Sequence, residues 1–137
     1  MRKLVSFGRD ERGTAVIEIA IALPVLILFI YGIFQVGVAF QANAGMQHAL
    51  GEGARLATIC QNPTAGGVCS TASNTTIAAR MNQKMFGTGI GTFTVNPIID
   101  SAGYKTLSVS FTMPMNFLFF QGPAVNMTRT KRVYIAT

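Results

Sequence analysis

Residues 13–40 read GTAVIEIAIALPVLILFIYGIFQVGVAF, a long and almost entirely apolar segment. From Ile19 to Phe40 it holds no charge, and Gln35 is its one strongly polar side chain. At about 1.5 Å rise per residue, a helix over these 22 positions is roughly 33 Å long, which matches the hydrocarbon core of a bilayer. The stretch therefore predicts a membrane-spanning helix.

The residues before this stretch predict its orientation. Residues 1–13, MRKLVSFGRDERG, contain four basic and two acidic side chains. Because positively charged flanks stay in the cytoplasm, we expect a cytoplasmic N-terminus and a C-terminal domain on the extracytoplasmic side of the membrane.

The composition excludes several classes of protein. Of 137 residues, half are hydrophobic and 12% are charged, about half the usual charged share of a soluble domain. The formal charge of +6 comes from basic residues near the two ends of the chain, without a basic stripe interleaved with aromatics. We therefore expect membrane lipid as a partner and no nucleic acid.

A stripe of small residues follows the membrane segment. Gly45, Ala49, Gly53 and Ala57 recur every fourth position, so they share one face of a continuing helix. Small side chains allow close helix packing. The stripe predicts contact either with another subunit or with the chain's own C-terminal domain.

Pro24, inside the apolar segment, predicts a kink or local loosening, which is either functional or a static bend.

Two cysteines enclose a short polar loop. Cys60 and Cys69 are close enough in sequence for one disulfide, which an exported domain would form. In the chain-entropy model, a disulfide that closes such a loop adds roughly 2.5–3 kcal/mol to the free energy of unfolding. His48 and these two cysteines do not provide enough ligands for zinc, so we expect no metal and no cofactor.

The rest of the chain predicts a second helix and a small antiparallel sheet, an α+β domain. Ser73 and Asn74 are N-cap candidates for a helix over residues 77–85, and Gly87 is placed to end it. Alternation predicts strands over 92–95, 107–112 and 130–136, with a turn at 100–103 between the first two. The expected division is a leader (1–13), a transmembrane and assembly helix (14–60) and an extracytoplasmic domain (61–137).

An apolar loop with proline at both ends separates the last two strands. Residues 113–123 read MPMNFLFFQGP. Such a loop either folds over the sheet as core or forms a surface for a partner or the membrane. We favour the core interpretation.

The residues at the entrance to the apolar segment carry the functional signal. Gly13 ends the basic leader, and the lone carboxylate of Glu18 follows five residues later. A charge near the bilayer is costly, so a carboxylate here indicates a partner or a task.

In Gly13, Glu18 and the run GTAVIEIAIALPVLI, the sequence resembles type IV pilins, and more closely the TadE-like pseudopilins of the tight-adherence (Tad, or Flp) pilus. The resemblance implies cleavage between Gly13 and Thr14 by a prepilin peptidase, and packing with other pilin-like subunits on an inner-membrane secretion platform. Major Flp pilins are shorter and have Tyr where Ile19 stands, and many pilins begin with Phe where Thr14 would. A minor pseudopilin is therefore expected.

Glu18 has a plausible chemical task in such a subunit. Cleavage creates a cationic amine at Thr14, and a carboxylate one helical turn away can pair with that amine or with a neighbour's. We expect this pairing to set the register of assembly.

Two alternatives to a pilus subunit remain, and within the pilus itself the chain could instead be the adhesive tip, presenting the Cys-bounded and Phe-rich loops to a ligand. A secreted protein would be cut after Ala42-Asn43-Ala44, although the apolar segment is too long for a signal peptide. An uncleaved anchored protein would keep Met1, and either form could carry an adhesive or binding domain. We expect no enzyme, because His48 and Glu52 make only a pair four residues apart on one helix face and Asp100 is isolated.

Overall fold

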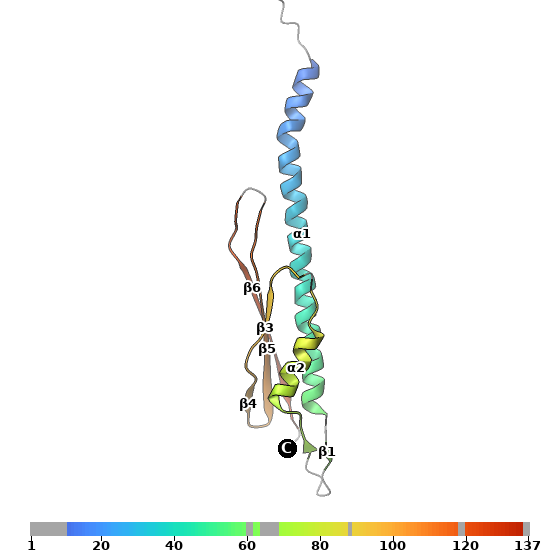
Figure 1. The fold of residues 1–137 in the computed structure, drawn as a ribbon, viewed down its shortest axis with the longest axis vertical. Helices are drawn as coiled ribbons and strands as arrows, with labels where there is room; N and C mark the ends of the chain where they lie inside the picture. The colour runs from blue at the N-terminus through green and yellow to red at the C-terminus, as the bar shows by residue number, and fades with distance from the viewer. Residues whose placement is uncertain (1–10, 60–61, 64–68, 88, 118–119, 136–137) are drawn as a thin grey trace, which may run out of the picture.

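The computed structural model describes residues 11–59, 62–63, 69–87, 89–117 and 120–135. The elements, in chain order, are α1 (Glu11–Thr58), β1 (Asn62–Pro63), β2 (Cys69–Ser70), α2 (Asn74–Lys84), β3 (Thr92–Val95), β4 (Ile99–Ser101), β5 (Tyr104–Met113) and β6 (Val125–Tyr134). The predicted α+β layout, a long helix followed by a short helix and an antiparallel sheet, is confirmed. The sheet and α2 lie along the C-terminal half of α1, whose N-terminal half stands clear of them (Figure 1).

The sheet is built around β5. Strand β6 pairs with β5 over its whole length, from Tyr104↔Tyr134 to Met113↔Val125. On the other edge of β5, β3 and β4 pair with successive parts of the strand. The predicted turn lies between β4 and β5, where Gly103 adopts φ +79°, a value that glycine accepts without strain. Asp100 and Ser101 belong to β4 rather than to the turn itself.

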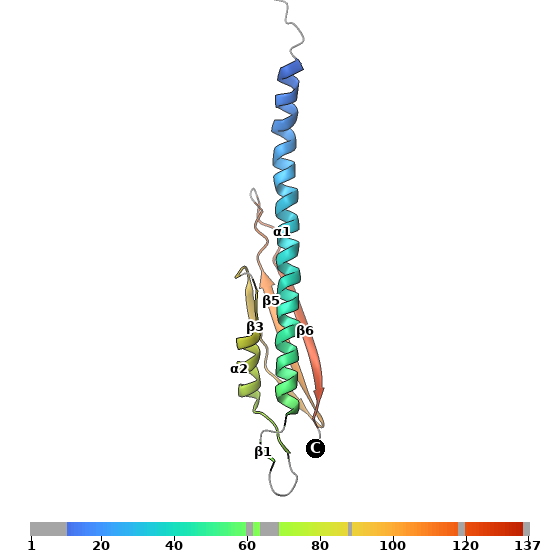
Figure 2. The ribbon, with the colours of Figure 1, turned by 90° about the vertical axis from the view of Figure 1, so that its right-hand side faces the viewer.

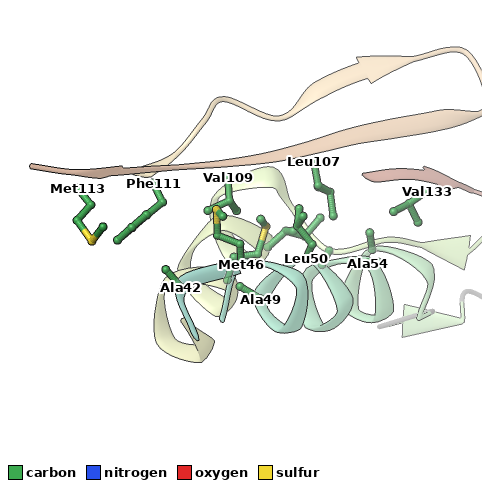
Figure 3. Close-up of a cluster of buried hydrophobic side chains, with 14 of the residues drawn as sticks. Ala42, Met46, Ala49, Leu50, Ala54, Leu107, Val109, Phe111, Met113 and Val133 are labelled. Atoms are coloured by element: carbon green, nitrogen blue, oxygen red, sulfur yellow. The ribbon is translucent and has the colours of Figure 1, made fainter. Parts of the chain in front are cut away.

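One face of β5 forms the core of the domain. Its burial alternates along the whole strand, as the sequence predicted for residues 107–112. Figure 3 shows this face above α1, with the side chains of both elements pointing toward each other. The buried hydrophobic residues come from α1, α2 and the sheet: Val38, Ala42, Met46, Ala49, Leu50, Ala54, Ala57, Ala72, Ile77, Met81, Leu107, Val109, Phe111, Met113 and Val133.

Helix α2 confirms its predicted start but ends before the predicted residue. The Ser73 side chain accepts a hydrogen bond from the Thr76 amide at 3.2 Å, which is N-capping. The last helical residue is Lys84, and Met85 follows as the C-cap in extended conformation, so the helix ends before Gly87. Gly87 instead lies against the ring of Phe93, where a Cβ atom would come within 2.8 Å of the ring.

The last strand is longer than predicted. β6 begins at Val125, five residues before the predicted position, because β5 offers a partner for every residue back to Met113. Ala136, the predicted end of the strand, lies outside the described residues. Viewed from the side, α2 and β3 flank one side of α1 and β6 flanks the other (Figure 2).

Candidate membrane and assembly surface

The predicted processing residues lie in the first turns of α1. Gly13 and Thr14 follow Glu11 within the helix, and a Cβ atom at Gly13 would meet nothing within 4 Å. Glu18 lies one turn after Thr14, so the two side chains share a face of the helix, and Glu18 is exposed. This geometry leaves Glu18 accessible to a neighbouring chain.

The N-terminal half of α1 exposes an apolar surface. Val16, Ile21 and Phe29 are each more than 60% exposed, and the helix meets the length and hydropathy of a membrane span between Gly13 and Thr58. None of the most apolar stretch of this helix is buried inside the protein. A soluble domain rarely exposes so large a continuous apolar surface. The bare helix thus fits a membrane-anchored protein.

Two further features belong to this bare part of the helix. The helix continues through Pro24 without ending. A shallow apolar groove lies on the same part of α1 and is lined by side chains between Glu18 and Phe29. The carboxylate is therefore at one end of an apolar surface that could receive another helix.

The stripe of small residues contacts the chain's own domain. Gly45, Ala49, Gly53 and Ala57 are all buried. A Cβ atom at Gly45 would overlap the carbonyl oxygen of Phe86, and one at Gly53 would come within 2.6 Å of the Met81 side chain. Of the two uses predicted for the stripe, the structure has the one within the subunit: small residues let α2 and the segment after it approach α1.

His48 and Glu52 each contact the α2 region rather than each other. The Nδ1 atom of His48 lies 3.1 Å from the carbonyl oxygen of Lys84, and its ring packs edge-on against Phe86. Glu52 forms an ion pair with Arg80 at 3.4 Å. Both side chains therefore help to attach α2 to α1.

A polar cluster that the sequence did not reveal joins α2 to the sheet. Lys105 is on the inward face of β5 and only 8% exposed, and its Nζ atom donates to the Asp100 carboxylate at 2.6 Å and to the Asn74 side-chain oxygen at 2.7 Å. Asn74 in turn donates to Asp100 at 2.6 Å. The hydrogen bonds from Lys105 and then from Asn74 hold the pKa of the Asp100 carboxyl below its usual range.

The apolar loop after β5 is only partly core. Met113, which is the last residue of β5, is fully buried and Met115 packs against the core, whereas Pro114 is exposed and Phe120 is 57% exposed. The loop contacts α1 through Gln35, whose side-chain amide donates to the carbonyl oxygen of Asn116 at 2.9 Å. Gln35 is the polar residue in the middle of the apolar segment, and sequence reasoning assigned it no role.

The predicted disulfide involves a residue outside the described part of the chain. Cys60 lies there, while Cys69 is in β2, where it pairs with Pro63 in register. Among the described residues, no group of three His, Cys, Asp or Glu side chains could hold a metal ion.

Comparison with known proteins identifies the region that carries these features. Residues 13–55 match the family described as TadE-like protein. No curated protein and no solved structure matches the chain. The matched region contains Gly13, Glu18, the bare apolar helix and most of the buried stripe. Over this region, about a third of its length, the chain is similar to TadE-like proteins.

Proposed function

We propose that this protein is a minor pseudopilin that takes part in assembling a Tad/Flp-type pilus. The observation that carries the proposal is the position of Glu18: an exposed carboxylate, one turn after Thr14, at the start of a bare apolar helix. A structural subunit needs a surface of this kind, because it must leave lipid contacts for contacts with other helices.

The proposed first step is cleavage between Gly13 and Thr14 by a prepilin peptidase. Hydrolysis of this bond removes the basic leader and leaves a cationic amine on Thr14. In or near hydrocarbon, an unpaired carboxylate and an unpaired amine are each costly. Pairing of the Glu18 carboxylate with the Thr14 amine of an adjacent subunit removes both costs and favours one axial register.

The proposed packing surface is the exposed part of α1 between Glu18 and Phe29. The buried stripe from Gly45 to Ala57 is already covered by the chain's own domain, including α2 and the segment after it, and is not open to a second subunit. Other pilin-like subunits would therefore pack on the membrane-spanning half of the helix. Such packing places the domains on the outside of the assembly.

The proposed topology follows from the leader. Its basic residues keep the N-terminus in the cytoplasm, so α1 crosses the inner membrane and the domain folds in the periplasm. The inner-membrane secretion platform then meets the chain at its cytoplasmic end, and the finished subunit is retained in the membrane or incorporated into a surface pilus.

The test replaces Glu18 while keeping its shape. Glu18→Gln should still insert and be cleaved, but it should fail to co-purify with pilin-like subunits or sheared pili. Glu52→Gln is the matched control, because Glu52 pairs with Arg80 within the subunit and lies beyond the membrane segment. Equal incorporation of Glu18→Gln and the wild-type chain would contradict the proposed pairing.

A further inference from the structure

The hairpin tip between β5 and β6 lies beside the membrane-spanning part of α1. We define this tip by its described residues, 115–117 and 120–123. Besides the hydrogen bond from Gln35 to Asn116, the ring of Phe117 packs edge-on against Tyr31, with centroids 6.4 Å apart. Figure 1 shows this hairpin extending along α1 toward its N-terminal half. The domain therefore reaches back to residues that belong to the apolar segment.

The depth of Tyr31 in a bilayer can be bounded from the sequence. A hydrocarbon core of about 30 Å takes up about 20 helical residues. If the core begins directly after Arg12, it ends near Gly32, and Tyr31 lies roughly 2 Å inside the boundary. If it begins after Glu18, it ends near Val38, and Tyr31 lies roughly 10 Å inside. In both registers the ring beside Phe117 lies within the membrane.

The backbone of the tip is suited to a medium without water. The Phe117 amide donates to the Phe120 carbonyl at 2.8 Å, and the Gly122 amide donates to the Met115 carbonyl at 2.7 Å. The Asn116 carbonyl accepts from Gln35. Backbone polar groups that enter a membrane need partners within the protein, and these two amides and three carbonyls have them.

The side chains of the tip are arranged as in an interfacial element. Asn116 and Gln121 pair across the hairpin, and Phe117 and Phe120 stack beyond them with centroids 4.6 Å apart. No charged residue occurs between Lys105 and Arg129, so both strands are uncharged where they approach the membrane. A polar pair followed by two aromatic rings, of which Phe120 is exposed and Phe117 half-buried, matches the gradient from headgroups to acyl chains.

We infer that this hairpin tip inserts into the bilayer leaflet on the side of the domain, as a second membrane contact beside α1. The inference rests on the proposed membrane anchoring of α1. It explains the position of Gln35: its amide is used to hold the tip against the helix. Two membrane contacts, one by α1 and one by the hairpin tip, fix the orientation of the domain relative to the membrane plane.

The test uses tryptophan as a depth probe, because the chain contains none. Phe120→Trp places a single fluorophore at an exposed position of the tip, where it should leave the fold intact. The full chain is reconstituted into phosphatidylcholine and phosphatidylglycerol nanodiscs, with or without bromine on the acyl chains. The Trp emission should shift to the blue and be strongly quenched by the brominated lipid.

Two matched variants separate the inference from the anchoring. Ile21→Trp reports on the apolar part of α1 and should be quenched, whereas Tyr134→Trp, at the far end of β6, should not. An unquenched Phe120→Trp beside a quenched Ile21→Trp would overturn the hairpin contact and leave the anchor in place. If Ile21→Trp is also unquenched, the membrane anchoring itself is wrong. Circular dichroism of each variant verifies the fold.

Discussion

The close approach of α1 to the segment after α2 depends on the absence of a side chain at Gly45. A Cβ atom there would overlap the carbonyl oxygen of Phe86 and stand 3.2 Å from its carbonyl carbon. The obstacle is backbone, so Gly45→Ala forces the two segments apart by roughly 1 Å, at the upper end of the usual overpacking cost of about 1–3 kcal/mol. The helix gains about 1 kcal/mol from alanine. The net expectation is a loss of about 2 kcal/mol.

Gly51 provides a matched control in the same helix. A Cβ atom at Gly51 would meet nothing within 4 Å, so Gly51→Ala should keep the full helix-propensity gain of about 1 kcal/mol. The two identical substitutions, six positions apart, should therefore change stability in opposite directions.

Hydrogen–deuterium exchange of β5 amides in the reconstituted full chain measures this difference. A loss of 2 kcal/mol corresponds to a fall of about thirty-fold in protection for Gly45→Ala, whereas Gly51→Ala should raise protection about five-fold. Protection in Gly45→Ala equal to or above that in Gly51→Ala would refute the packing argument.

Two further predictions concern the domain. Lys105 holds the pKa of Asp100 below the usual value of 3.8, so the Asp100 carboxylate contributes stability that is present above about pH 4 and lost as pH falls through the folded pKa. Asp100→Asn should therefore reduce the fall in melting temperature below pH 4. An equal fall in the variant and the wild-type chain would contradict this. If Cys60 and Cys69 are bonded, the purified chain should have a mass two hydrogens below that of the reduced chain, and equal masses would exclude the bond. Cys69→Ser should then lower the free energy of unfolding in urea by about 2.5–3 kcal/mol.

The large elements were predictable because their sequence patterns are strong. The uncharged run to Phe40 predicts a membrane-spanning helix by its length alone. The alternation after Leu107 determines which face of β5 is buried. Ser73 is a local signal that needs no tertiary context.

The rest depends on contacts between distant residues. The early part of β6 has only Val125 and Met127 as apolar residues, and it is a strand in the structure because it pairs with β5. Lys105 occupies a buried position because the Asp100 carboxylate pairs with its charge and Asn74 accepts a second hydrogen bond, which sequence spacing alone does not reveal. The stripe beginning at Gly45 indicated close packing but not the partner, since α2 and a second subunit would select the same small residues.

In the candidate site, too, the residues close together in sequence could be predicted and the contacts between distant residues could not. Gly13 and Glu18 could be identified from their spacing, because the family pattern lies within a few consecutive residues. The hairpin tip could not, because its relation to the apolar segment depends on Gln35 meeting Asn116, residues separated by most of the folded domain.

The proposed pairing of Glu18 with an amine depends on which residue begins the native protein. Mass spectrometry of the chain purified from membranes with an active prepilin peptidase should recover a subunit that begins at Thr14. A chain that begins at Gly45 would indicate a secreted protein, and one that keeps Met1 on every copy would leave Glu18 without the amine that the proposed assembly requires.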